Sequence, residues 1–201
     1  MQSGESCFNL LCNCASPLIR HERSPAINHS AYPLSGQEPL EIERKFLIEY
    51  PDPAWLEQQP GSRRVEIVQT YLLSDGSGSR RVRSWTESGR TTWFRTCKRM
   101  LTDRTRIEQE DQVTEEEYRS LLAEADPARH PIEKVRWCVP WASHMLEIDL
   151  YPFWEKQAVL EVELRDEDEV FQIPPELRIL REVTGDPRYL NSSLAREIPD
   201  E

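Results

Sequence analysis

The sequence contains little glycine, no set of paired cysteines and no long run of apolar residues. Its 7 glycines in 201 residues exclude a collagen-like or low-complexity chain. No apolar stretch approaches the roughly 18–20 residues that a membrane-spanning helix needs, so we expect no membrane partner and a cytoplasmic protein. The 5 cysteines are odd in number, and Cys7, Cys12 and Cys14 crowd near the start, which is not the pattern of a disulfide framework. We therefore expect reduced thiols.

The charge balance is acidic, with 36 acidic and 25 basic residues and a formal net charge of −11. Such a chain is repelled by nucleic acid, so we expect no nucleic-acid partner, although net charge does not exclude a local basic pocket. The length predicts one domain with a sizeable core. We expect that domain to span residues 40–196, between an N-terminal extension (1–39) that is predicted to be disordered and a short tail (197–201).

Segments with a two-residue period predict a largely β fold, because successive side chains of a strand point to opposite faces. Thr114 begins a predicted helix with a capping box, and shorter helices are expected near residues 54–59 and 176–181. The predicted strands cover residues 41–48, 65–73, 79–85, 91–98, 105–113, 132–139, 145–151 and 158–165.

Along most of these strands a charged residue stands at every second position, and the residues between are mainly apolar. Acidic residues gather on some strands and basic residues on others. A single pair such as Glu161 and Glu163 is more often a solvated sheet face. Repetition through most of the strands argues instead for a shared interior. The side chains of this pattern are Glu41, Glu43, Lys45, Arg81, Arg83, Lys98, Arg106, Glu108, Glu110, Lys134, Arg136, Glu147, Asp149, Glu161 and Glu163.

A closed barrel of antiparallel strands with these charges inside explains the pattern. A barrel of about eight strands has an interior just wide enough for side chains and one small ligand. Unpaired charges in a dry core are costly, so we expect a hydrated interior that binds ligands of both signs. A triphosphate would meet the basic residues, and Mg²⁺ or Mn²⁺ would meet the carboxylates. The predicted fold class is α+β, a closed eight-stranded antiparallel β-barrel with a few flanking helices.

The ordered series of motifs resembles the CYTH superfamily, the triphosphate tunnel metalloenzymes. Glu41, Glu43 and Lys45 match the opening E-x-E-x-K strand of that family. The R-x-R, lone lysine, R-x-E-x-E, K-x-R, E-x-D and E-x-E strands follow in order, as does the closing segment 183–189 with Asn191. The resemblance covers about residues 40–195. It implies a tunnel barrel that hydrolyses or transfers the phosphates of a triphosphate with the help of a divalent metal.

The resemblance also implies roles for individual residues. It implies that metal is held by Glu41, Glu43, Glu161 and Glu163, with Glu110 and Asp149 nearby, and that Glu108 and Glu147 line the tunnel. It implies that phosphate oxygens are bound by Lys45, Arg81, Arg83, Lys98, Lys134 and Arg136, together with Arg106. Glu41, Glu43 and Lys45 form the predicted catalytic group. We expect Glu41 or Glu43 to accept the proton of an attacking water, and the sequence does not choose between them.

The substrate stays open at this stage. The compact C-terminal ending resembles the small bacterial and plant-type members of the family, which implies inorganic tripolyphosphate as the substrate. No aromatic-rich element for a base or thiazole is evident in the sequence. A class IV adenylate cyclase or a nucleoside or thiamine triphosphatase is the enzymatic alternative, and a non-catalytic polyphosphate-binding module is the alternative of another class. One departure from the family is the lack of glycine in residues 99–103, after Lys98. We expect a monomer or homodimer, and we expect His21, His29, His130 and His144 to be surface residues.

Overall fold

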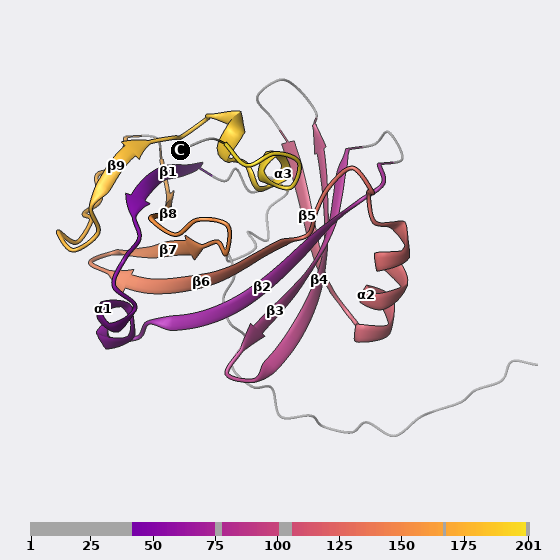
Figure 1. Cartoon of the computed structure of the whole chain (residues 1–201), viewed down its shortest axis with the longest axis horizontal. Helices are drawn as coiled ribbons and strands as arrows, with labels where there is room; N and C mark the ends of the chain where they lie inside the picture. The colour runs from indigo at the N-terminus through magenta and orange to yellow at the C-terminus, as the bar shows by residue number, and fades with distance from the viewer. Residues whose placement is uncertain (1–41, 75–77, 101–105, 167, 200–201) are drawn as a thin grey trace, which may run out of the picture. The chain divides into compact units, whose positions relative to one another are not determined.

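The computed structural model describes residues 42–74, 78–100, 106–166 and 168–199, and it describes only the backbone of 98–100 and 106–108 (Figure 1). The predicted extension (1–39) and Glu41 therefore lie outside the described residues. The elements follow in this order: β1 (Ile42–Glu49), α1 (Pro53–Gln58), β2 (Arg63–Leu72), β3 (Ser79–Glu87), β4 (Arg90–Met100), β5 (Arg106–Val113), α2 (Glu115–Leu121), η1 (Leu122–Glu124), β6 (Ile132–Trp141), β7 (His144–Leu150), β8 (Gln157–Leu164), β9 (Ile179–Glu182), η2 (Pro187–Tyr189) and α3 (Asn191–Leu194).

The strands form one antiparallel, strongly curved sheet in the order β5-β4-β3-β2-β6-β7-β8-β1-β9 (Figure 1). This confirms the predicted α+β class, with an antiparallel sheet and few helices. Two details of the prediction were wrong. The sheet has nine strands rather than eight, and the pairings among the described residues leave β5 and β9 as edges instead of closing a barrel. The ninth strand arises because β9 pairs with β1 on the side away from β8 and so extends the sheet beyond β1.

The ninth strand lies where the sequence predicted a short helix near residues 176–181. In the structure Arg181 is opposite Leu47 and Glu182 is opposite Phe46. The strand partner of this segment is β1, which is far away along the chain. The Arg44 and Glu182 side chains, which pair across these two strands, are 138 positions apart. A weak local helix preference gives way to such tertiary pairing.

The helix predicted to begin at Thr114 is confirmed. The Thr114 hydroxyl accepts a hydrogen bond from the Glu117 backbone, and the Glu117 side chain accepts one from the Thr114 backbone. This capping box satisfies amide groups that have no partner within the helix. Tyr118 of α2 then packs with Leu72 of β2 and Val82 of β3. The helix therefore covers one side of the sheet.

The main apolar core lies on the outer face of β1, β6, β7 and β8, which we define by Phe46, Ile48, Ile148 and Leu160. These side chains are at most 5% exposed. Leu56 of α1 and Phe171 and Leu177 of the connection between β8 and β9 pack onto them. This arrangement agrees with the predicted placement of charged side chains on the inside of the sheet. The apolar side chains face outward and are covered by flanking segments.

The opposite face of the sheet, the inner face, carries the predicted charged residues between two apolar clusters. At one end Leu47, Tyr71 and Tyr151 pack with residues of η2 and α3. At the other end lies a cluster of Val65, Ile67, Trp85 and Cys138, with Phe94 against it. No helix in the described parts of the chain is long and apolar enough to cross a membrane. Cys97 and Cys138 carry free thiols, as predicted.

Candidate active site

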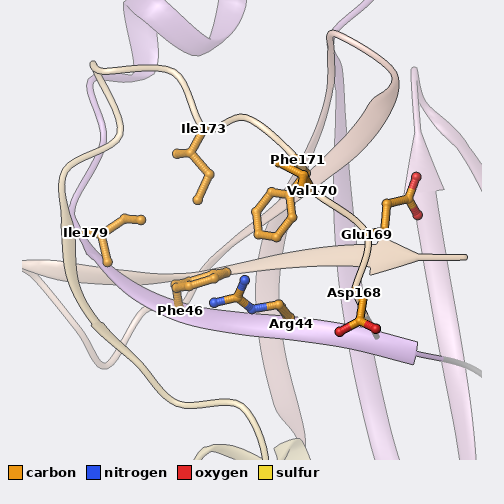
Figure 2. A pocket seen from close by; sticks show the side chains of 8 residues that line it. All are labelled: Arg44, Phe46, Asp168, Glu169, Val170, Phe171, Ile173 and Ile179. Atoms are coloured by element: carbon orange, nitrogen blue, oxygen red, sulfur yellow. The ribbon is translucent and has the colours of Figure 1, made fainter. Parts of the chain in front are cut away.

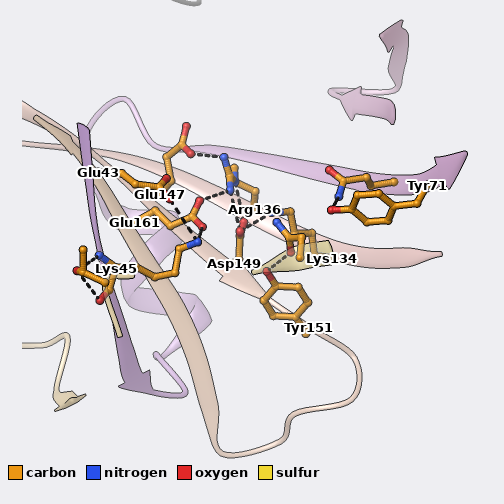
Figure 3. A network of polar contacts seen from close by, with 12 residues as sticks. Glu43, Lys45, Tyr71, Lys134, Arg136, Glu147, Asp149, Tyr151 and Glu161 are labelled. Atoms are coloured by element: carbon orange, nitrogen blue, oxygen red, sulfur yellow. Dashed lines mark hydrogen bonds and ion pairs between the residues drawn. The ribbon is translucent and has the colours of Figure 1, made fainter. Parts of the chain in front are cut away.

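Strand register brings the charged residues of β1, β6, β7 and β8 together on the inner face (Figure 3). Lys45 is opposite Glu161, and Glu161 is opposite Glu147. Asp149 is opposite Arg136. Because alternate residues of a strand share a face, each of these pairs points to the same side of the sheet. The two-residue spacing seen in the sequence is therefore what assembles the site.

Arg136 is the centre of this network. Its Nε and Nη2 atoms donate to the two oxygens of Asp149 at 2.6 and 2.7 Å, and Nη2 also donates to Glu161 at 2.7 Å. Its Nη1 atom donates to Glu147. Three carboxylates thus surround one guanidinium. Burial alone would lower the pKa of Arg136, but Asp149 and Glu147 raise it well above its usual value.

Two lysines complete the network from opposite sides. Lys134, whose side chain is 3% exposed, donates to Asp149. Lys45 lies 2.8 Å from Glu161 and 3.5 Å from Glu43. Burial, reinforced by the neighbouring charge of Arg136, lowers the pKa of Lys134. Burial also opposes the charged form of Lys45, but Glu161 and Glu43 raise its pKa overall.

Asp149 is fully buried, with 0% exposure, so its negative charge is compensated by Arg136 and Lys134 instead of by solvent. Burial would raise its pKa, but Arg136 and Lys134 hold the pKa of this carboxyl well below its usual range. Glu161 is similar: burial opposes its ionisation, and Arg136 keeps its pKa lowered. The network is therefore a set of buried charges that neutralise one another. In this part acids and bases meet directly, and the hydrated interior stays a prediction.

The carboxylates at the start of β1 and the end of β8 are arranged differently. Glu43 is directly opposite Glu163, so two like charges face each other across neighbouring strands. Burial and the nearby Glu147 and Glu43 raise the pKa of Glu163. Within the described residues no cation pairs with the Glu163 side chain. Like charges in direct opposition destabilise a sheet, and a bound cation would relieve them.

The chemistry of these groups suits a hard divalent cation, which prefers carboxylate oxygens. Among the residues that the structure describes, however, no three ligand groups converge on one point. Glu147 and Glu161 point toward Arg136, and Glu43 points toward Lys45 (Figure 3). The donor set therefore fits in type and in register, while Glu43, Glu147 and Glu161 are engaged by the chain's own cations.

A second basic group lies on β3. Arg83 pairs with Glu110 of β5 at 2.5 Å, and Glu110 also accepts a hydrogen bond from Thr96 at 2.8 Å. Burial and the adjacent Arg81 lower the pKa of Arg83, and Arg136 adds to this repulsion. Burial opposes the ionisation of Glu110, but Arg83 keeps its pKa lowered. The electrostatic influence of Arg136 on Arg83 means that β3 and β6 contribute to one crowded basic region.

Several predicted site residues cannot be placed by their side chains. Glu41 lies outside the described residues. The backbones of Lys98, Arg106 and Glu108 are described, and Lys98 is paired with Glu108 across β4 and β5. The roles predicted for these residues stay predictions.

The structure adds residues that the sequence reasoning missed. Trp85 and Phe94 share the inner face with Arg83. The two-residue period already placed Phe94 on the charged face, but it assigned no role to either ring. Arg181 is opposite the inner-face residue Leu47, but it was assigned to a helix. The prediction that His144 is a surface residue was wrong. Its side chain is 6% exposed, and its Nε2 atom lies 3.2 Å from Glu169 of the connection between β8 and β9, which folds over it.

A pocket of about 420 Å³ lies on the outer face, near the same strand β1 (Figure 2). Arg44 and Phe46 line it together with Val170, Phe171 and Ile173 of the segment after β8. These two β1 residues alternate with Glu43 and Lys45, so the pocket opens on the face opposite the charged network. The Arg44 guanidinium is already paired with Glu182, at 2.8 and 2.5 Å. The pocket is therefore separate from the candidate active site.

Comparison with known proteins agrees with this geometry. No family model matches the chain. The chain is 34% identical over 157 residues to an inorganic triphosphatase of Acetivibrio thermocellus, covering 78% of this chain and 93% of that protein. It is also similar to the crystal structure of the inorganic triphosphatase NE1496, with a TM-score of 0.51 and 28% identity over 82% of this chain and 100% of that one. A second crystal structure of NE1496, described as a hypothetical protein, gives a TM-score of 0.52. With its ordered charged strands and this relative, the chain belongs to the CYTH superfamily, among its triphosphatase-like members.

Proposed function

We propose that this protein hydrolyses inorganic tripolyphosphate to pyrophosphate and phosphate, with Mg²⁺ or Mn²⁺ as cofactor. The observation that supports it most is the sorting of charge on the inner face. Acidic residues of β1, β7 and β8 lie beside basic residues of β6, and Arg136 contacts the carboxylates of β7 and β8. A similar relative is named an inorganic triphosphatase. A triphosphate with a divalent cation satisfies both groups at once.

The phosphate chain would be bound by Lys45, Lys134, Arg81, Arg83 and Arg136. The lowered pKa values of Lys134 and Arg83 arise from burial and from neighbouring positive charges, which an anion would neutralise. Phosphoryl transfer depends mainly on positioning and on neutralising charge that develops on the phosphate oxygens. Basic side chains fixed by strands are suited to that task. Lys98 and Arg106 are expected to join them.

The cation would be held by carboxylates of Glu43, Glu161 and Glu163, with Glu147 beside them. Glu110 is paired with Arg83, and Asp149 is paired with Arg136 and Lys134. We therefore expect these two carboxylates to hold the basic side chains in place and to lie farther from the metal than the other predicted ligands. When bound, a divalent cation supplies polarisation of the terminal phosphate and a lowered pKa of the attacking water.

Proton transfer is assigned to a carboxylate of β1. Of the two candidates from the sequence, Glu41 and Glu43, only Glu43 lies within the described residues. The Glu43 side chain is 40% exposed, so water can reach its oxygens, and Lys45 lies 3.5 Å away. We expect a Glu43 carboxylate oxygen to accept the proton of the attacking water, with Lys45 holding the phosphate in line.

The inner face favours an inorganic substrate over an organic one. The aromatic residues Tyr71, Trp85 and Tyr151 of this face are 4%, 7% and 3% exposed. Phe94 is half-buried beside Arg83. Recognition of a nucleobase or thiazole commonly uses an accessible ring face or a set of hydrogen-bonding groups. Tyr71, Trp85 and Tyr151 are too deeply buried to offer such a ring face.

The test is phosphate release by the purified full-length chain from tripolyphosphate, ATP and thiamine triphosphate, each with Mg²⁺, with Mn²⁺ or with EDTA. We expect tripolyphosphate to be preferred and EDTA to abolish turnover. Glu43→Gln should remove turnover while the protein stays folded. Glu133→Gln is the matched control, since Glu133 is an exposed carboxylate between Ile132 and Lys134 and points away from the network.

The contrary outcomes are specific. Equal turnover in EDTA would exclude a metal cofactor. Turnover that survives the double substitution Arg81→Ala/Arg83→Ala, compared with the outer-face control Arg95→Ala, would exclude the phosphate-binding role of β3. Formation of cyclic AMP from ATP would support the adenylate cyclase alternative. Tight tripolyphosphate binding without turnover would support the non-catalytic binding module.

A further inference from the structure

The two central arginines of the inner face are held in different ways. Arg136 donates through all three guanidinium nitrogens to carboxylates of Asp149, Glu147 and Glu161. Arg83 donates to one carboxylate, that of Glu110, through Nη2. The Arg83 Nε atom is buried and forms no hydrogen bond within the described residues. Arg83 therefore keeps donor capacity that Arg136 has already used.

Two aromatic rings lie near the Arg83 guanidinium, whereas three carboxylates surround the guanidinium of Arg136. The Arg83 guanidinium carbon lies 6.0 Å from the centre of the Trp85 ring and 5.9 Å from the centre of the Phe94 ring. Phe94 is directly opposite Arg83 across β3 and β4, and Trp85 is two residues along β3 on the same face. The rings are in turn fixed by Val65 and Ile67 of β2, which are at most 1% exposed.

Rings and carboxylates hold a guanidinium with different consequences. A carboxylate cancels the positive charge and occupies N–H groups. An aromatic ring attracts the cation through its quadrupole without neutralising it and without using an N–H group. A largely buried guanidinium close to two rings is therefore restrained in position and still able to donate to an anion.

We propose that Trp85 and Phe94 are positioning residues that hold Arg83 ready to bind a phosphate oxygen of the substrate. The proposal rests on the proposed function, because it takes a phosphate chain as the ligand of Arg83. It assigns neither ring a direct contact with the substrate. It also predicts that Arg83 is available to bind a phosphate oxygen before Arg136, because the Arg136 donors must first be released from carboxylates.

The test is a double-mutant cycle on tripolyphosphate hydrolysis by the full-length chain, using Trp85→Leu, Arg83→Ala and the combined variant. We expect Trp85→Leu to raise KM about three- to tenfold, the range of a buried cation–π contact, with kcat changed less than about twofold. In the Arg83→Ala background the same substitution should change KM less than about twofold, because the residue through which it acts is gone. Trp85→Phe, which keeps a ring, should restore a KM close to that of the wild type.

Controls separate positioning from folding. Trp93→Leu changes the neighbouring tryptophan of β4, which packs on the other face with α2, and should leave KM unchanged. Urea unfolding of each variant shows whether it is folded under assay conditions. If Trp85→Leu does not fold, the same cycle with Phe94→Leu takes its place, since Phe94 is only half-buried. An equal rise in KM with and without Arg83, or no rise, would overturn the proposal.

The wild type and the three variants of the cycle are also compared by the dissociation constant of tripolyphosphate, measured by calorimetry in EDTA. This measurement needs no turnover. A wild type that binds but releases no phosphate would refute the proposed function and still test the positioning of Arg83. A wild type that neither binds nor hydrolyses tripolyphosphate would overturn both. Normal hydrolysis with an additive cycle would overturn the positioning role alone.

Discussion

Replacement of Asp149 by asparagine is the most direct test of the buried network. Asp149 is 0% exposed, and both of its oxygens accept hydrogen bonds from Arg136, while Lys134 donates to it as well. Asparagine has nearly the same shape but no charge, so two buried cations lose their shared partner. Removal of one partner of a buried ion pair costs about 3–5 kcal/mol. For a protein of this length we expect the thermal midpoint to fall by roughly 6–20 °C.

The pH dependence gives an independent signature of the same residue. The pKa of Asp149 is lowered in the folded state, because the attraction of Arg136 and Lys134 exceeds the effect of burial. Its contribution to stability is therefore present above its unfolded pKa of about 3.9 and is lost as the pH falls below that value. We expect the wild type to lose up to about 1.4 kcal/mol per pH unit more than Asp149→Asn in this acid range.

The assay is urea unfolding followed by tryptophan fluorescence, at pH 7 and at steps between pH 5 and pH 3. Asp111→Asn is the matched control, because Asp111 pairs with Arg95 at 3.0 Å with both side chains about 40% exposed. Exposed pairs of this kind contribute about 0–1 kcal/mol. If Asp149→Asn is no more destabilising than Asp111→Asn, the reasoning on buried charge is refuted. Parallel stability curves of wild type and Asp149→Asn below pH 4 would refute the assigned titration.

Three further substitutions test other parts of the structure. Glu163 has a raised pKa from burial, Glu147 and Glu43, so its ionisation opposes folding, and its effect grows as the pH rises above about 4.3. Glu163→Gln should therefore raise the metal-free unfolding free energy at pH 7 by at most about 1 kcal/mol, since the group is largely exposed. The same substitution should reduce the stabilisation that added Mn²⁺ gives the wild type, measured as a shift in thermal midpoint. Thr114→Ala removes the capping box of α2 and should cost about 1 kcal/mol in urea unfolding without changing KM. Leu160→Ala opens a cavity in the outer core and should cost about 2–5 kcal/mol in the same assay, and an effect below 1 kcal/mol would contradict the packing of that face.

The membership of the inner face could be predicted from the sequence because it depends on a local rule. Each strand alternates its side chains, so Glu43 and Lys45, or Glu147 and Asp149, share a face whatever the rest of the chain does. The capping box of α2 is local in the same sense. What the spacing cannot give is the partner of each charge. The contact of Arg136 with Glu161 joins residues 25 positions apart and depends on the register of three strands.

The wrong predictions share a cause in long-range pairing. Residues 179–182 form a strand because β1 offers a free edge, and no local signal specifies that edge. The same pairing leaves β5 and β9 at the edges of the described sheet. His144 was assigned to the surface because it falls outside the charged faces, but Glu169 and Phe171 of a later segment pack against it. The role proposed for Phe94 likewise depends on β3, where Arg83 lies directly opposite it.

The network also explains how a face so rich in charge can fold. Arg136, Lys134 and Lys45 neutralise Asp149, Glu161 and Glu147 by direct contact, so these charges are buried with partners of opposite sign. If the site takes up the proposed divalent cation and tripolyphosphate, we expect these partners to exchange: Glu147 and Glu161 would hold the cation, and Arg136 would be free to donate to phosphate. Either ligand alone would leave one half of the broken pairs uncompensated, at a cost of several kcal/mol. Binding of the cation and binding of tripolyphosphate should therefore strengthen each other, and by linkage the factor is the same in both directions. Equal affinity for tripolyphosphate with and without the cation would mean that Arg136 does not change partners.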